Sequence, residues 1–509
     1  MSCHDDPTAF LCHPDVLIID PDDSVAVALR QLDPSYRIEV PQGSVTLLDT
    51  ILPGHKFALK DIQEGETVIK YGHSIGIAVK TIQRGELVHT HNLTSNLEDQ
   101  SYYYHSPRSS HLRSSESQTF QGYRRNNGSV GIRNDIWIIP TVGCIAHVAS
   151  SLADWGNEMV RDGRFEGIDS CKALSHVHGC SQLGDDHEAT VRLLASLASH
   201  PNAAGVLVIG LGCENNSLES FVSRIDPSVF DHMKTLNCQS VEDELTEGRI
   251  LLAQLAAHAQ TCERESIDIG QLVVATKCGG SDGFSGITAN VLVGLFSDWL
   301  VAHGGSAILS EIPEMFGTET ILFDRCANVE VYRRLKAVIN KQKRHFISHG
   351  QPIHENPSPG NKEGGITTLE EKSLGCIRKG GTSTIIDIID YGKCVTKKGL
   401  GILEGPGNDM ISITAMAASH AHLVLFTTGR GTPLGTVIPC IKISSNSQLA
   451  DKKPNWIDFD AGTVLNEGPQ PVLQDLIEMI KDVASKRILT NNEHNGFEHI
   501  AILKDGVTL

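Results

Sequence analysis

Four apolar runs in the middle of the chain each end in a cysteine beside a glycine, and this pattern constrains the fold more than any other feature. The runs cover residues 136–144, 173–180, 205–213 and 271–278. If they are parallel strands, their carboxyl ends meet along one edge of a sheet, which is where open α/β sheets bind ligands. We therefore expect thiols from distant positions to share one crevice, an arrangement that suits a soft or borderline metal ion.

The size and charge of the chain limit what it can be. With 509 residues, of which 40% are hydrophobic, it can bury more than one core, and we expect two or three domains. The formal net charge of −18 and the lack of a basic run argue against binding to nucleic acid.

The cysteines and the apolar segments indicate the cellular compartment. The thirteen cysteines include no C-x-x-C pair, which fits a reducing compartment better than a disulfide framework. The longest apolar region, residues 287–309, is interrupted by Asn290, Asp298 and His303, so a membrane span is not expected. The first residues lack the pattern of a secretion signal. We expect a cytoplasmic protein without membrane or nucleic-acid partners, and the sequence leaves homo-oligomer formation open.

Shifts in pattern along the chain predict its domains. Short strand-like runs broken by turns predict a small all-β module in residues 1–95, and residues 96–121 are polar and serine-rich, as in a linker. From residue 122, apolar runs alternate with amphipathic helical patterns such as 188–199 and 242–262, which is typical of β-α-β units. We expect one α/β domain in residues 122–269 and a second in 270–509, each with a mainly parallel sheet, and a helix near 471–486.

The all-β module carries a group of histidines. His89 and His91 are two residues apart, so in a strand they would point to the same face, and His55 begins a neighbouring strand-like run. Such imidazoles could hold a metal or move a proton, because imidazole titrates near neutrality. Solvent-exposed histidines without a ligand are also common, and the pattern alone does not decide between the two interpretations.

Longer blocks of the sequence carry a resemblance to a known family. Residues 55–59 (HKFAL), 69–72 (IKYG) and 88–92 (VHTHN) resemble the SAF module, a β-clip fold, that begins altronate and galactarate dehydratases. The resemblance continues through the rest of the chain, in residues 122–134 (GYRRNNGSVGIRN), 179–186 (GCSQLGDD), 210–216 (GLGCENN), 278–286 (CGGSDGFSG), 311–317 (EIPEMFG), 356–365 (NPSPGNKEGG), 404–409 (EGPGND) and 426–433 (FTTGRGTP).

The resemblance implies the loss of water from a sugar acid. A proton would leave C2 and hydroxide would leave C3, giving a 2-keto-3-deoxy acid; for D-altronate this is 2-keto-3-deoxy-D-gluconate. A carbon beside an ionised carboxylate is a weak acid, so the site must supply positive charge, together with a general base and a general acid. The family depends on ferrous iron, with manganese as a substitute in some members, and such an ion would act as a Lewis acid.

Two sets of residues compete for the metal. We favour Cys180, Cys213 and Cys278, which could hold Fe²⁺ or Mn²⁺, or equally a [4Fe-4S] cluster with one iron lacking a protein ligand. Cysteine is a small residue that packs well at tight turns, so each of these cysteines, taken alone, could instead have only a packing role. The histidines His55, His89 and His91 are the competing ligand set, or else the catalytic acid and base.

Basic and polar residues on glycine-rich loops are candidates for binding the substrate carboxylate. Lys362, which we also count among the catalytic candidates, lies in a turn rich in proline and glycine, and Arg430 lies between Gly429 and Gly431. Arg133 with Asn134 is a third candidate, and an arginine can offer a bidentate fork to a carboxylate. Each could instead be a solvated charge on a loop.

Two classes of function follow from these observations. The first is a metal-dependent hydro-lyase acting on D-altronate, with galactarate as the alternative substrate. The second is a non-catalytic carbohydrate-binding protein in which the β module binds a sugar and the cysteines are structural.

Overall fold

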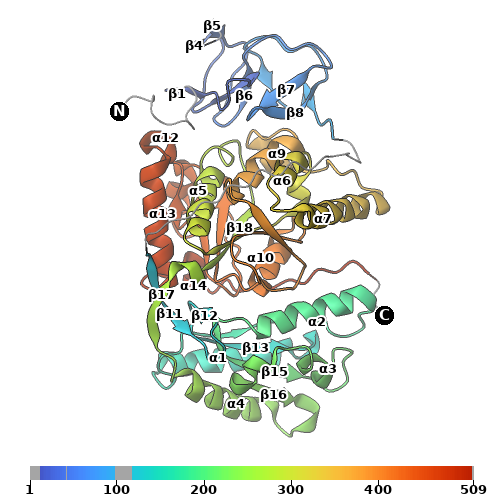
Figure 1. Ribbon diagram of the computed structural model, residues 1–509, viewed down its shortest axis with the longest axis vertical. Helices are drawn as coiled ribbons and strands as arrows, with labels where there is room; N and C mark the ends of the chain where they lie inside the picture. The colour runs from blue at the N-terminus through green and yellow to red at the C-terminus, as the bar shows by residue number, and fades with distance from the viewer. Residues whose placement is uncertain (1–11, 42, 98–116, 507–509) are drawn as a thin grey trace.

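The computed structural model describes residues 12–41, 43–97 and 117–506, and these form three tiers (Figure 1). A β module lies at one end, a domain built on a seven-stranded sheet lies in the middle, and a domain built on a four-stranded sheet lies at the other end. Most of the linker predicted at residues 96–121 lies outside the described residues. The fold class is confirmed, because an all-β module precedes two α/β domains with parallel sheets.

The β module is made of short antiparallel strands. One sheet has the order β1-β2-β3-β6-β9, with bounds Cys12–His13, Val16–Leu17, Val25–Ala28, Lys56–Ala58 and Leu87–Val88. A second has the order β10-β8-β7, Leu93–Thr94, His73–Ala78 and Thr67–Lys70, and a hairpin joins β4 (Arg37–Val40) to β5 (Gly43–Thr46). Strands β3 and β6 are buried on both faces, because their alternate residues pack into two different apolar clusters.

The prediction that His89 and His91 share a strand face is wrong. Strand β9 ends at Val88, and the next residues form a turn in which the backbone N–H of His89 donates to Oδ1 of Asn92 at 2.9 Å. An asparagine side chain that binds the backbone in this way ends the strand locally. His89 is consequently half-buried, whereas His91 is exposed.

The four-stranded domain is a parallel sheet with the order β14-β13-β15-β16, bounded by Cys171–Ala173, Asp135–Pro140, Ala203–Gly210 and Met233–Asn237. Helices α1 (Ala146–Arg161) and α4 (Glu244–Ala259) pack with one face of the sheet. Helix α2 (Gly184–Ala198) contributes to another apolar cluster, which it shares with the seven-stranded domain. A ribbon of β11 (Thr119–Arg124), β12 (Val130–Gly131) and β17 (Arg264–Asp268) also links the two domains.

The seven-stranded domain is parallel throughout, in the order β20-β21-β19-β18-β22-β23-β24. Its strands span Ile385–Ile389, Leu400–Leu403, Ser306–Leu309, Val273–Cys278, Leu423–Thr428, Cys440–Ser444 and Phe459–Asp460. The principal helices are α5 (Ala289–Ala302), α7 (Val329–Ser348), α10 (Asp409–Ala418) and α13 (Pro469–Ala484). The near-continuous apolar strands fit a sheet that is covered on both faces.

Three of the four runs that end in cysteine contain strands, namely β13, β15 and β18. The run at residues 173–180 is different, because β14 ends at Ala173 and the rest of the run is a loop. The expected helices at 188–199, 242–262 and 471–486 correspond to α2, α4 and α13, and a short helix α14 (Asn491–Asn495) follows the last of them.

Candidate active site

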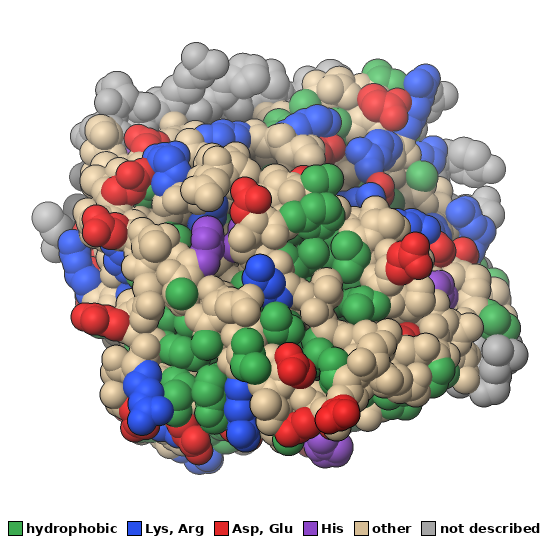
Figure 2. Space-filling model, turned by 90° about the horizontal axis from the view of Figure 1, so that it is seen from below, with side chains coloured by type: hydrophobic (Ala, Val, Ile, Leu, Met, Phe, Trp, Pro, Cys, Tyr) green, Lys and Arg blue, Asp and Glu red, His purple; other side chains and the backbone are tan. Residues whose placement is uncertain are grey.

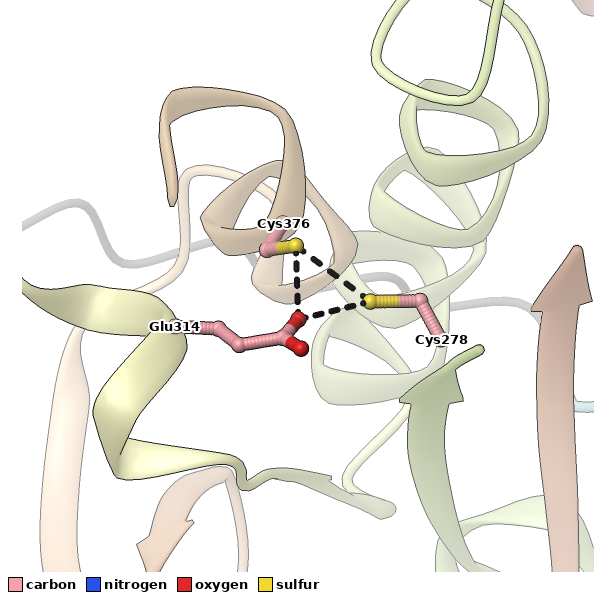
Figure 3. Close-up of side chains that lie close together, drawn as sticks. All are labelled: Cys278, Glu314 and Cys376. Atoms are coloured by element: carbon pink, nitrogen blue, oxygen red, sulfur yellow. Dashed lines mark hydrogen bonds between the residues drawn. The ribbon is translucent and has the colours of Figure 1, made fainter. Parts of the chain in front are cut away.

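Two thiols and a carboxylate meet at the carboxyl end of the central strand of the seven-stranded sheet (Figure 3). Cys278 ends β18, Glu314 lies in the short helix η5 (Ile312–Met315), and Cys376 ends α9 (Leu369–Cys376). The two sulfur atoms are 3.3 Å apart, and Oε2 of Glu314 lies 3.2 Å from Sγ of Cys278 and 3.0 Å from Sγ of Cys376. All three side chains are buried, and we call them the thiol–carboxylate cluster.

The backbone around this cluster is tightly constrained. Gly279 follows Cys278, and a Cβ atom added there would lie 2.5 Å from Oδ2 of Asp409 and 2.8 Å from Cζ of Phe426, so a side chain there would displace both neighbours. Glu311 has a φ of 72°, a left-handed conformation that is costly for a residue with a side chain. Its carboxylate accepts the backbone N–H of Cys278 at 3.1 Å, which fixes the end of β18.

Three buried lysines surround the cluster. Nζ of Lys379 lies 2.9 Å from Sγ of Cys278, Nζ of Lys372 lies 2.9 Å from Oε1 of Glu314, and Lys277 binds Glu311. Burial alone would raise the pKa of Glu314, but the ammonium groups of these lysines hold that pKa well below its usual range. An ammonium group beside a thiol also favours the thiolate form, which is the form that binds metals.

The second thiol of the cluster is held in its neutral form. Its hydrogen bond with Cys278, together with burial, holds the pKa of Cys376 well above the usual value for a thiol. Losing this proton would require a compensating positive charge between the side chains. A bound divalent cation supplies such a charge and deprotonates the thiols that coordinate it.

A small cavity lies beside the cluster, between the β module and the seven-stranded domain. Its lining includes Lys70 and Tyr71 from the β module, and Asp282, Lys372 and Cys376 from the other side. The cavity therefore brings ammonium groups, a thiol and a carboxylate together on its walls. Such an environment strengthens electrostatic interactions with a bound anion.

Asp282 is the carboxylate in this lining, and it has several donors. Its Oδ1 accepts from the hydroxyls of Ser285 and Ser445 at 2.8 and 2.7 Å, and its Oδ2 accepts from Nδ2 of Asn446 at 3.0 Å. Burial nevertheless raises its pKa above the usual value. Asp282 can therefore take up a proton more readily than a solvated aspartate.

An ion-pair chain joins the β module to this cavity. Oε2 of Glu371 lies 2.8 Å from Nζ of Lys56, and its Oε1 lies 2.7 Å from Nζ of Lys70, with all three side chains buried. Burial alone would raise the pKa of Glu371, but the two ammonium groups lower it to about 2. The two lysines that share this carboxylate have different pKa values. Burial lowers the pKa of Lys56 to about 8, whereas the attraction of Glu371 keeps the pKa of Lys70 above its usual value.

The chain extends to one of the predicted histidines. Nζ of Lys56 donates to Oγ1 of Thr367 at 2.6 Å, and this hydroxyl lies 2.9 Å from Nδ1 of His89. Burial, followed by the charge of Lys56, lowers the pKa of His89 to about 4, so its ring is neutral near pH 7. The ring of His55 packs edge-on against that of His89 with centroids 5.5 Å apart. His91 is exposed.

Lys362 and Arg430 lie at the outer side of the loop that carries Asp282. Lys362 is in α8 (Pro359–Glu363), and Nη2 of Arg430 lies 2.9 Å from Oε2 of Glu363 in the same helix. The backbone N–H of Arg430 donates to the carbonyl of Gly280 at 2.9 Å. These two candidates thus lie near each other and near the cavity loop, with the side chain of Arg430 partly exposed.

The structure assigns Arg133 and Asn134 to packing rather than to substrate binding. Both are buried, and the guanidinium of Arg133 pairs with Glu493 and with backbone carbonyls. The amide of Asn134 donates to the carbonyls of Gly167 and Ala259. With these groups already satisfied inside the protein, they have little left to offer a ligand.

The expectation that Cys180, Cys213 and Cys278 converge is wrong. Cys180 and Cys213 follow strands of the four-stranded sheet and are exposed, whereas Cys278 ends a strand of the seven-stranded sheet and is buried. Strands of two separate sheets do not share an edge. In residues 12–41, 43–97 and 117–506, just two groups of potential ligand atoms lie within 4.8 Å of one another: the thiol–carboxylate cluster, and the exposed group His345, His349 and Asp505.

Most of the site was not predicted from the sequence. The residues concerned are Lys56, Lys70, Lys277, Glu311, Glu314, Glu371, Lys372, Cys376 and Lys379. Six of them, namely Glu311, Glu314, Glu371, Lys372, Cys376 and Lys379, lie on helices or turns, so the apolar periodicity of strands gives no signal for them. Lys56, Lys70, Glu311 and Glu314 do lie in the sequence blocks singled out above, and a buried charge in such a block would have been the clue.

Among the residues that the structure describes, no helix has both the length and the apolar character that a bilayer span requires.

Comparison with known proteins yields matches along nearly the whole chain. Three family models match: the altronate/galactarate dehydratase SAF domain over residues 14–96, the D-galactarate dehydratase/altronate hydrolase second domain over 122–260, and the D-galactarate/altronate dehydratase C-terminal domain over 269–508. The chain is 47% identical to an altronate dehydratase of Bacillus subtilis over 491 residues, which cover 96% of this chain and 98% of the relative.

Two relatives from Escherichia coli are also similar. An altronate dehydratase is 45% identical over 493 residues, covering 96% of this chain and 98% of the relative. A galactarate dehydratase (L-threo-forming) is 32% identical over 519 residues, covering 97% of this chain and 96% of the relative.

Proposed function

Because the chain belongs to the D-galactarate/altronate dehydratase family, in which it is a hydro-lyase, we propose that it dehydrates D-altronate to 2-keto-3-deoxy-D-gluconate. The structural observation that carries the proposal is the small cavity in which Lys70 and Lys372 lie next to the thiol–carboxylate cluster. Removing the proton from the carbon beside a carboxylate gives a dianion. Cations that are already in place stabilise this dianion without any rearrangement of the site.

The donor set of the cluster fits the metal that we propose. Two thiols and one carboxylate, Cys278, Cys376 and Glu314, are mutually within hydrogen-bond distance and are buried, and such a mixed set suits ferrous iron. Fe²⁺, or Mn²⁺ in its place, would supply Lewis-acid stabilisation of the substrate carboxylate when bound. Lys379 would stabilise the Cys278 thiolate, and Lys372 would orient the Glu314 carboxylate.

The lysines that line the cavity would bind the substrate. The ammonium groups of Lys70 and Lys372 would hold the sugar-acid carboxylate against the cluster, and Asp282, whose pKa is raised by burial, would exchange a proton with the substrate. Lys362 and Arg430 would attract the anion at the outer side of the same loop.

The histidines would serve proton transfer in this proposal. Neutral His89 can accept a proton, and the hydroxyl of Thr367 connects it to Lys56, whose pKa of about 8 lets it exchange a proton near neutrality. The Glu371 carboxylate, which pairs with both lysines, would hold Lys56 and Lys70 in place. His55 would hold the ring of His89 in place through their edge-on contact.

A direct assay tests the proposal. The full chain is loaded anaerobically with Fe²⁺ or Mn²⁺ and incubated with D-altronate or with galactarate, and 2-keto product is measured. We expect turnover of altronate by the wild type, little by the folded Cys376→Ala variant, and loss of stoichiometric metal in that variant. A folded, metal-loaded wild type that binds a sugar acid but forms no keto product would support the carbohydrate-binding alternative instead.

A further inference from the structure

Three exposed cysteines lie at one edge of the four-stranded sheet, outside the site described above. Cys144 follows β13, Cys180 follows β14 and Cys213 follows β15. These strands are neighbours in the order β14-β13-β15 and run parallel, so their carboxyl ends meet at the same edge. The thiols therefore face solvent from adjacent loops, and the packing role that explains most cysteines does not apply to them.

The loops that carry these cysteines are bound to one another. The backbone N–H of Gly143 donates to the carbonyl of His178 at 2.8 Å, and that of Asn216 donates to the carbonyl of Gly179 at 3.0 Å. A Cβ atom added to Gly179 would lie 2.0 Å from the carbonyl oxygen of Thr141, so only glycine permits this approach. The fold thus holds the Cys144 loop against the Cys180 loop, and the Cys180 loop against the Cys213 loop.

Buried polar groups beside these loops lack partners. Gln182 is 4% exposed, its Oε1 accepts the N–H of Gly179 at 3.0 Å, and its Nε2 has no hydrogen-bond partner. Oδ1 of Asn216 and Oδ1 of Asn237 are also buried and unpaired. An unpaired buried amide costs free energy, and a bound ion or ligand is a common explanation of such a group. On the solvent side, Nε2 of Gln239 donates to Sγ of Cys213 at 3.6 Å.

Three thiols on adjacent loops suit a cluster better than a single ion. In the described part of the chain, no group of ligand atoms at this edge lies within 4.8 Å of one another, as a single ion would require. In a [4Fe-4S] cluster each cysteine binds a different iron atom, so the ligand sulfur atoms lie farther apart than around a single ion. We infer that Cys144, Cys180 and Cys213 bind a [4Fe-4S] cluster whose fourth iron has no cysteine ligand.

Cys238 follows the fourth strand of the same sheet but does not belong to this set. It packs with the apolar cluster formed by α1, α4 and the sheet, and burial raises its pKa to about 11. A thiol in that setting resists the ionisation that iron binding needs.

Anaerobic reconstitution of the full-length protein with ferrous iron and sulfide tests the inference. We expect acid-labile sulfide together with bound iron, with the iron exceeding the sulfide by the one ion of the thiol–carboxylate cluster, and the broad absorption of sulfur-to-iron charge transfer. Each of the variants Cys144→Ser, Cys180→Ser and Cys213→Ser should lose sulfide to background. Cys262→Ser is the matched control, because Cys262 is a partly buried thiol that follows α4 in the same domain, and it should retain the full sulfide content.

The sulfide content of the protein tests the [4Fe-4S] cluster separately from the dehydratase function proposed above. Cys376→Ser should lose the metal of the thiol–carboxylate cluster but keep the sulfide signal. Iron without sulfide in the wild type, or equal sulfide in Cys180→Ser and Cys262→Ser, would overturn the inference whatever the dehydratase assay shows. Circular dichroism of the exposed-cysteine variants verifies that they are folded.

Discussion

Nζ of Lys56 lies 2.8 Å from Oε2 of Glu371, although 315 residues separate the two in the chain. Their ion pair crosses from the β module to the seven-stranded domain and is buried on both sides. The same carboxylate also pairs with Lys70, so a single side chain is the ion-pair partner of two buried lysines. This contact joins the β module to the domain that forms the rest of the candidate site.

Replacing Glu371 should destabilise this interface strongly. The variant Glu371→Gln leaves two buried ammonium groups without a countercharge, which costs about 3–5 kcal/mol when one partner of a buried pair is removed. Urea denaturation followed by fluorescence would measure the loss. Glu64→Gln, an exposed carboxylate of the β module, is the control and should change stability little. Equal stability of the two variants would show that the ion pairs do not hold the interface.

Oxidation should inactivate the enzyme reversibly. The sulfur atoms of Cys278 and Cys376 are 3.3 Å apart, so hydrogen peroxide can take two electrons from the pair, with loss of both thiol protons, to form a disulfide. We expect mass spectrometry to find this crosslink and a thiol reductant to restore activity. In Cys376→Ser the crosslink cannot form. Inactivation by peroxide without any crosslink would locate the sensitive group elsewhere.

Acid should destabilise the protein through buried neutral histidines. Nδ1 of His422 accepts the backbone N–H of Val273 at 2.9 Å, its Nε2 binds the carbonyl of Val130, and burial lowers its pKa to about 4 from 6.5. Because the unfolded chain binds the proton more readily, stability is lost as the pH falls from about 6.5 to about 4, by up to about 3 kcal/mol.

The non-titrating variant His422→Gln separates this contribution from that of other groups. Its thermal midpoint, measured between pH 7 and pH 4, should depend less on pH than that of the wild type. His73→Asn, which changes an exposed histidine, should retain the wild-type slope. If the His422→Gln slope matched the wild type, the acid sensitivity would arise at other residues.

Lys372 should matter more to turnover than Arg430. Loss of a hydrogen bond to a charged group costs about 1.5–3 kcal/mol, so Lys372→Met should lower kcat/KM by about 10- to 100-fold. Arg430 is partly exposed and already paired with Glu363, so Arg430→Met should lower kcat/KM by no more than about 5-fold. Steady-state kinetics on altronate with matched metal content would measure both. The reverse order would move the carboxylate site to the outer loop.

The sequence allowed the fold class to be predicted because the strands are regular. The period-two strands of the β module and the apolar runs at β13, β15 and β18 follow directly from side-chain burial. The prediction of a strand through His89 and His91 was wrong because the side chain of Asn92 accepts the backbone N–H of His89 and closes a turn after Val88. This local hydrogen bond competes with the pairing of a strand.

The active site was harder to predict because it depends on contacts between distant segments. Cys278 was identified, but its partners Glu314 and Cys376 come from short helices with no period of their own. Lys56 and Lys70 lie in strands where a lysine usually points to solvent, and only the docking of the β module buries them. Which strands share a sheet edge is likewise set by topology, and this is why the four cysteine runs did not converge.

A cavity assembled from two parts of one chain depends on their covalent connection. Lys70 and Tyr71 reach the cavity from one side of residues 98–116, and Asp282 and Cys376 reach it from the other. The intervening peptide therefore sets the effective concentration at which the two halves meet. If that peptide were cut, both fragments would still be present, yet catalysis would become bimolecular and would fade on dilution.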